Sequence, residues 1–304
     1  MLGPLHDRLL WYVIAAGALG IALPDVAGKL QGVVPVMLAG QVAGVTLTLT
    51  ASRLFRVLRH PAPVLAALAA QWLIVAPAGI LLGRLIGNGT VGTGVVISAA
   101  APAEITSSLV AVLAAGAGEV AVLCMASSLA LGTVLTPELV TLGLQGEARV
   151  DTPALLLELT LCVALPLVAG VALRTNVSAL AGQAARCLDL AAISVVLVVF
   201  VAGGAARGIV GTLSLPAAVG ACLGLQALSY AVGFVAGWVM RFPRAVRRAI
   251  IFPIGMREFG IATAVALTVT PEAAGVAGVY GVLVMITGPA LAMNLRRRSR
   301  RTAL

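Results

Sequence analysis

Three ionisable side chains, Glu104, Arg257 and Glu258, lie inside stretches of sequence that are otherwise almost entirely apolar. A charged residue is expensive to bury in such surroundings, so one found there usually serves a function. A carboxylate can bind a cation or a proton, and a guanidinium can pair with a carboxylate or hold an anionic ligand. These three residues are therefore the first candidates for a site that handles ions or a charged ligand.

The composition indicates what surrounds these charges. The chain has 304 residues, of which 61% are hydrophobic and 10% are charged, and its mean hydropathy is +1.09. Soluble domains carry about 25% charged residues, so this chain has too few to cover a water-facing surface. The sequence predicts an all-α integral membrane protein with one membrane domain, 1–304. The net charge of +9 comes mostly from arginines clustered between apolar runs, which indicates membrane topology and not nucleic-acid binding.

Charged or Pro/Gly-rich boundaries divide the chain into about ten apolar runs long enough to span a membrane. The predicted spans are 9–24, 32–52, 63–86, 90–115, 118–137, 153–173, 184–206, 212–240, 246–269 and 273–294. One set of alternate loops and tails carries 15 of the 20 Lys and Arg residues and the other carries four, while Arg257 lies within the ninth span. This bias predicts a multi-pass protein of the inner (plasma) membrane with both termini in the cytoplasm and a basic tail, 295–304.

The fourth and ninth spans both contain residues that interrupt a helix. These helix-break residues are Pro102 in the fourth span and Pro253, Gly255 and Gly260 in the ninth. Because five spans separate the two breaks, a second five-span unit would enter the membrane upside down relative to the first. We expect two inverted repeats, about 9–137 and 153–294, whose discontinuous helices 4 and 9 face each other and form a transport site.

Four motifs carry a resemblance to a known family. They are Gly44–Thr50 with the following Phe55–Pro61, Gln71–Pro77, Pro102–Pro137, and Arg248–Ala264, which contains Gly-Met-Arg-Glu-Phe-Gly. In order and spacing they resemble the second, third, fourth to fifth and ninth helices of the bile acid:sodium symporter family. The resemblance implies ten spans in a panel domain (spans 1, 2, 6 and 7) and a core domain (spans 3–5 and 8–10). It also implies sodium-coupled uptake of bile acids or small carboxylates such as 2-keto acids.

The sequence departs from the family where the resemblance implies sodium ligands. One sodium site falls here on Ser107, Ser108, Ala121, Met125 and Pro253, of which only the two serines could be ligands. At the other implied site a glutamine of the third helix is retained as Gln71, but the glutamine of the ninth helix is replaced by Arg257. A cationic side chain repels sodium, so these replacements argue against ordinary two-sodium coupling.

Further candidates for substrate or ion binding flank the two breaks. They are Gln71, Thr106, Ser107, Ser108 and Met256, in addition to the three charged residues. Hydroxyl groups beside a broken helix can bind a carboxylate or, with Glu104, a weakly held Na⁺. Small hydroxyl residues also mediate close helix packing, which is the alternative interpretation.

If the broken helices cross, Arg257 and Glu104 could form an ion pair, with the arginine supplying the charge that sodium supplies in relatives. Three interpretations stay open. The pair could be a fixed link without coupling, Glu104 or Glu258 could bind a coupling cation or proton, or Arg257 could contact an anionic substrate.

The predicted function is secondary active transport of a small organic anion by alternating access, with Na⁺ or H⁺ as the coupling ion and no other cofactor. The alternative is a proton-coupled or uncoupled exporter of the arsenite or auxin-carrier type. An enzyme is not expected, because the only histidines are His6 and His60 at the membrane edge. The expected partners are the organic anion and the lipid bilayer, with no nucleic acid.

Overall fold

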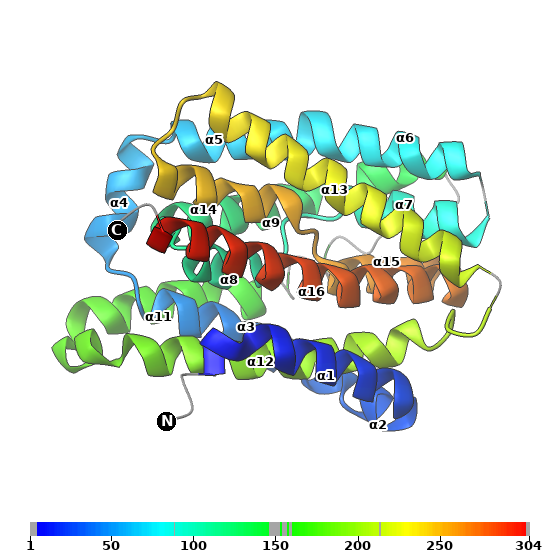
Figure 1. Ribbon diagram of the computed structural model, residues 1–304, viewed down its shortest axis with the longest axis horizontal. Helices are drawn as coiled ribbons and strands as arrows, with labels where there is room; N and C mark the ends of the chain where they lie inside the picture. The colour runs from blue at the N-terminus through cyan, green and yellow to red at the C-terminus, as the bar shows by residue number, and fades with distance from the viewer. Residues whose placement is uncertain are drawn as a thin grey trace.

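The computed structural model describes residues 5–87, 89–145, 160–212 and 214–301, together with residues 153 and 157. Every regular element in these ranges is a helix, as Figure 1 shows. This follows from the apolar sequence, because a helix satisfies its own backbone hydrogen bonds where no water can do so. Most of the first part of the predicted sixth span, 153–159, lies outside the described residues.

Five helices in the described part of the chain are long and apolar enough to cross a membrane. They are the continuous helix formed by α5 (Ala62–Ala69), η3 (Ala70–Val75) and α6 (Ala76–Ile86), and the helices α9 (Gly118–Gly143), α12 (Ala184–Ala206), α13 (Leu215–Val239) and α16 (Pro271–Arg301). A sixth is gained if the pair Gln31–Thr46 and Ala51–Arg59, bent by 85°, is counted as one span. The structure therefore establishes five or six candidate spans, and the number ten stays a prediction.

The remaining elements are shorter. They are η1 (Leu5–Arg8), α1 (Leu9–Ala22), α2 (Pro24–Lys29), η2 (Gln31–Val33), α3 (Val34–Thr46), α4 (Ala51–Arg59), α7 (Thr90–Ala100), α8 (Ser107–Leu113), η4 (Thr160–Ala164), α11 (Leu165–Asn176), η5 (Ser178–Gln183), α14 (Arg244–Gly255) and α15 (Phe259–Val269).

Both predicted helix breaks are present, between α7 and α8 and between α14 and α15. The first is set by Pro102, because a residue that precedes proline avoids helical geometry, and Ala101 is accordingly extended with ψ at 152°. Pro253 and Gly260, in contrast, were wrongly expected to break the ninth span: Pro253 lies within α14, which continues to Gly255, and Gly260 lies within α15. A proline removes one backbone donor, and the chain leaves the helix only after Gly255, where Met256 is extended.

The helices pack in two groups, which lie one above the other in Figure 1. One group contains α1, α2, α3, α11 and α12, and the other contains α5 to α9 and α13 to α16. Helix α12 joins the groups because it also packs against α16. The two broken helices belong to the second group, where α8 and α9 pack against α14, and α15 packs against α7 and α16.

Glycines allow α1 and α12 to approach each other at backbone distance. A Cβ atom at Gly20 would overlap the carbonyl oxygen of Phe200, and one at Gly203 would overlap the carbonyl oxygen of Gly17. Small residues of this kind are the usual way in which membrane helices come close, because lipid offers no hydrophobic driving force between helices. This contact stabilises the first group and with it the surface that faces the broken helices.

We expect the substitution Gly20→Ala to destabilise the protein by about 1–3 kcal/mol, because the added methyl group overpacks the contact between α1 and α12. The matched control is Gly220→Ala in α13, where an added Cβ atom would meet no atom within 4 Å. The measurement is the midpoint of thermal unfolding of the purified protein in detergent. Equal midpoints for both variants would contradict the packing argument.

Candidate functional site

The unwound segments of the two broken helices cross each other as antiparallel extended chains. The Glu104 N–H donates to the Met256 carbonyl, and the Glu258 N–H donates to the Pro102 carbonyl, each at 2.9 Å. The residues between these bonds form an isolated antiparallel bridge. Backbone groups freed by the breaks thus find partners in the opposite segment, which is what buried non-helical backbone in a membrane requires.

The carboxylate of Glu104 links the starts of both second half-helices. It accepts from the N–H of Thr106 at 3.3 Å, on its own side of the crossing, and from the N–H of Phe259 at 3.3 Å, on the other side. The Thr106 hydroxyl also donates to it at 3.2 Å. The side chain is fully buried, so these hydrogen bonds replace the water that the carboxylate would otherwise need.

Glu258 makes the reciprocal set of hydrogen bonds. Its carboxylate accepts from the N–H of Gly260 at 3.1 Å and caps α15, and it accepts from the N–H of Ile105 at 3.1 Å just before α8. Each glutamate thus binds the N–H two residues ahead in its own segment and the N–H that follows the glutamate in the other segment. The crossing has a local two-fold pattern that backbone and side chains share.

The carboxyl groups of Glu104 and Glu258 are direct neighbours within hydrogen-bonding reach. Both side chains are buried, with exposed fractions of 0% and 1%. Two adjacent buried carboxylates cannot both keep an uncompensated negative charge, because their repulsion is strong in a medium of low polarity. A proton shared between them, or a cation held by both, resolves this conflict.

Arg257 does not form an ion pair with Glu104, an arrangement that the sequence had left open. Its guanidinium donates to the carbonyl oxygens of Ala101 at 3.3 Å and Gln71 at 3.2 Å, and its backbone N–H donates to the Tyr280 hydroxyl at 3.2 Å. The reason is the extended backbone, in which successive side chains point to opposite faces. Arg257 therefore points away from the face on which both glutamates lie.

A second polar cluster surrounds the guanidinium on that opposite face. The Gln71 amide, in the orientation that satisfies both of its ends, accepts from Arg257 Nη1 at 2.7 Å and from the Ala103 N–H at 2.9 Å, and it donates to Ser128 Oγ at 3.0 Å. Gln71 lies in η3, a π-helical turn. Gln71 is recognisable in the sequence as a lone amide in an apolar span, whereas Ser128 carries no motif and is brought to the crossing by α9.

Gln41 of α3 reaches the carboxylate cluster from the other group of helices. The Thr106 hydroxyl donates to Gln41 Oε1 at 2.7 Å, while Gln41 Nε2 and the Ser107 hydroxyl are buried without a hydrogen-bond partner. Buried polar atoms of this kind are uncommon and call for a ligand, ion or water. Gln41 was not among the residues predicted from the sequence, although it is a lone amide in an apolar span, which is the signal that identified Gln71.

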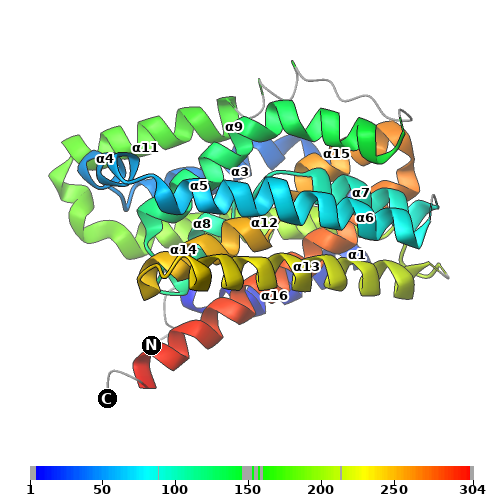
Figure 2. The ribbon, with the colours of Figure 1, turned by 90° about the horizontal axis from the view of Figure 1, so that it is seen from above.

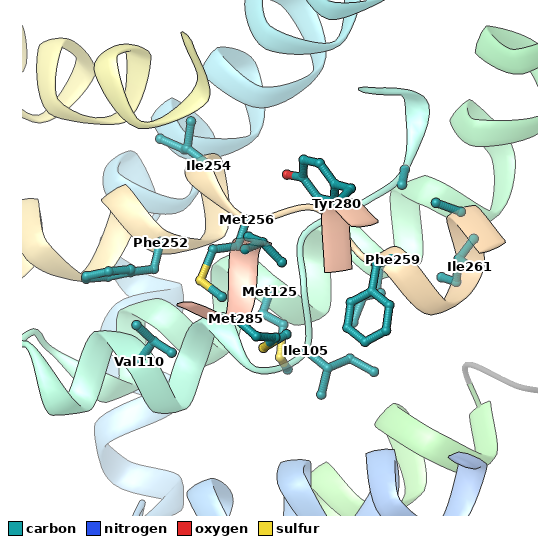
Figure 3. Close-up of a cluster of buried hydrophobic side chains, with 14 of the residues drawn as sticks. Ile105, Val110, Met125, Phe252, Ile254, Met256, Phe259, Ile261, Tyr280 and Met285 are labelled. Atoms are coloured by element: carbon teal, nitrogen blue, oxygen red, sulfur yellow. The ribbon is translucent and has the colours of Figure 1, made fainter. Parts of the chain in front are cut away.

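Two other candidates have different roles from those expected. The Met256 side chain packs among apolar residues with Met125 and Met285, as Figure 3 shows, so only its backbone carbonyl takes part in the crossing. The Ser108 hydroxyl donates to the Ile105 carbonyl at 3.2 Å within its own segment. The Ser107 N–H donates to the Glu104 backbone carbonyl at 3.0 Å, but neither serine hydroxyl bonds to the Glu104 carboxylate, with which both were candidates for a weak Na⁺ site.

An all-helical membrane protein in which two broken helices cross at a buried polar site has the architecture typical of secondary transporters. The family model described as the Sodium Bile acid symporter family matches residues 35–213, which is more than half of the chain. The chain belongs to this family. The matched region includes Gln41, Gln71 and Glu104 and ends before Arg257 and Glu258. No curated protein sequence gives a significant match.

We expect Glu258→Ala to lower the free energy of unfolding by about 1–3 kcal/mol, because it leaves the buried Ile105 N–H without a partner and removes the acceptor of the partly buried Gly260 N–H. In Glu258→Gln the free energy of unfolding should fall by less than half of this amount, since the amide oxygen can still accept a hydrogen bond. The readout is thermal and chemical unfolding in detergent, with the exposed Glu272→Ala as the matched control. A Glu258→Ala variant as stable as this control would rule out the capping role.

Proposed function

We propose that this protein is a secondary active transporter of a small organic anion, driven by protons and working by alternating access. The observation that carries the proposal is the contact between the carboxyl groups of Glu104 and Glu258 at the crossing of the two broken helices. A proton or cation that binds there relieves the repulsion between the two carboxylates. Its binding is therefore linked to the geometry of the crossing. Membership of the Sodium Bile acid symporter family supports transport as the activity.

The division of the helices into two groups supports alternating access. The group of α1, α3, α11 and α12 corresponds to the panel implied by the family resemblance, and the group with the broken helices corresponds to the core. Gln41 reaches the crossing from the first group and contacts Thr106 in the second. We infer that two inverted repeats make up the fold and that the substrate binds where the groups meet.

The unpartnered groups beside the crossing suit an anionic substrate. Gln41 Nε2 and the Ser107 hydroxyl are buried donors without an acceptor, and a carboxylate is an acceptor without donors of its own. Gln41 lies next to the glutamate pair through the Thr106 hydroxyl, which bonds to Gln41 and Glu104, and Ser107 follows Thr106 directly in the chain. A substrate carboxylate at these donors would be repelled by two ionised glutamates, so a proton on the pair would favour its binding.

We also propose that Arg257 takes the place of a bound sodium. The guanidinium is held by hard oxygen acceptors, namely the Ala101 carbonyl and the carbonyl and amide oxygens of Gln71. Oxygen atoms of this kind are the ligands that hard metal cations prefer. A permanent positive charge at this position would hold the two helices together and leave no site for sodium.

Uptake by proteoliposomes tests the coupling ion. A panel of small carboxylates, including 2-keto acids, is offered under an inward proton gradient, an inward sodium gradient or neither. We expect saturable uptake that the proton gradient accelerates and the sodium gradient does not. Glu104→Gln and Glu258→Gln should each remove the proton dependence, because an amide cannot take up the proton. The exposed Glu272→Gln is the control.

Three outcomes of that assay would overturn the proposal in different ways. Sodium-driven uptake with unchanged pH dependence in both glutamate variants would exclude proton coupling. Uptake that neither gradient accelerates would favour an uncoupled carrier. Proton-driven efflux without uptake would favour an exporter.

The substitution Arg257→Gln tests, independently of the uptake assay, the proposal that Arg257 takes the place of a bound sodium. It removes the cation and leaves the oxygens of Ala101 and Gln71 free to bind one. We expect NaCl, compared with KCl at the same concentration, to raise the unfolding midpoint of this variant but not of the wild-type protein. The stabilisation is about 1.4 kcal/mol when sodium is at ten times its Kd. Equal responses to both salts in the variant would contradict the proposal, and Arg257→Lys, which retains the charge, is the control.

A further inference from the structure

A basic and apolar groove lies at one end of the molecule, away from the crossing of the broken helices. It has a volume of about 460 Å³ and is formed by the end of α13, the start of α14 and the last part of α16. Its lining includes Arg244, Arg247, Arg248, Phe234, Trp238 and Leu295. Figure 2 shows that the beginning of α14 and the red end of α16 lie at the same end of the molecule.

The three arginines concentrate positive charge without an acidic residue in the groove lining. Arg248 lies in the electrostatic field of both Arg244 and Arg247, and its guanidinium is oriented by donating to the Ala114 carbonyl at 3.3 Å. The side-chain stem of Arg247 packs over Gly237 of α13, where an added Cβ would lie 3.1 Å from its Cγ. Like charges held this close are destabilising unless an anion lies between them.

The apolar part of the groove continues from these arginines along α13. Trp238 is 71% exposed and Phe234 is 41% exposed, and Leu295 of α16 lines the same groove. Aromatic residues next to arginines at the end of a membrane helix are typical of the interface between the headgroups and the acyl chains of a bilayer. The groove therefore presents positive charge and an apolar channel side by side.

We infer that this groove is a binding site for an anionic phospholipid. The headgroup phosphate lies between Arg244, Arg247 and Arg248, and an acyl chain lies along Phe234 and Trp238. Charge complementarity selects an anionic over a zwitterionic lipid, and the adjoining apolar wall selects a lipid over a free phosphate. Basic pockets between membrane helices bind anionic headgroups in this manner. The lipid holds the start of α14 against α13 and α16.

The test measures lipid binding to the purified full-length protein in neutral detergent by native mass spectrometry and by thermal unfolding. The probes are phosphatidylglycerol, phosphatidylcholine with the same acyl chains, and glycerol 3-phosphate. We expect phosphatidylglycerol alone to bind and to raise the unfolding midpoint. The double substitution Arg244→Gln and Arg247→Gln should weaken its binding by about 30-fold, from two headgroup contacts.

The matched control is the double substitution Arg53→Gln and Arg56→Gln, which removes the same charge from two exposed arginines of α4 outside the groove. This control should bind phosphatidylglycerol like the wild-type protein. Trp238→Ala should weaken binding of phosphatidylglycerol and leave the protein folded, since the side chain is exposed.

The inference is overturned if both double variants lose binding equally, because the effect would then be one of net charge. It is also overturned if glycerol 3-phosphate stabilises the protein as well as phosphatidylglycerol does, or if phosphatidylcholine binds equally. Each of these results concerns the binding of lipid and is independent of the coupling ion.

Discussion

The backbone hydrogen bonds exchanged between the two broken helices are the interaction on which the rest of this molecule depends. A helix that opens inside a membrane exposes N–H and C=O groups that lipid cannot satisfy. Here each opened segment supplies the missing partners of the other, through the bonds that join Glu104 to Met256 and Glu258 to Pro102. The carboxylates of Glu104 and Glu258 then satisfy the N–H groups that remain at the starts of the following half-helices. Each break thus relies on the other for hydrogen-bond partners.

The extended geometry of the crossing separates the charged residues into two sites. Glu104 and Glu258 lie together on one face, where Gln41 approaches them through Thr106, and Arg257 lies on the other face with Gln71. A permanent positive charge and a pair of groups able to exchange a proton are therefore close in space but not paired. An ion pair between Arg257 and Glu104 would have removed the group that the proposed proton coupling needs.

The arginines of the basic groove are separate from the charges at the crossing and have a different proposed role. Arg244, Arg247 and Arg248 begin the same helix, α14, that ends two residues before Arg257. One end of this helix thus lines the basic groove and the other end enters the crossing. An anionic lipid at its start would set the position of a helix whose far end carries the polar site.

The sequence by itself determined the membrane class, the presence of two helix breaks and the family resemblance, because composition, proline and glycine content and motif spacing are local properties, although Pro253 proved to lie within a helix. It also identified Glu104, Glu258, Arg257 and Gln71, since a polar group in an apolar run is visible without a structure. Only the tertiary structure decided which of these groups meet. The antiparallel crossing placed the two glutamates together and turned Arg257 away, and it brought in Gln41 and Ser128 from distant helices. Side-chain direction in an extended segment depends on register with its partner, and that register exists only once both broken helices have packed.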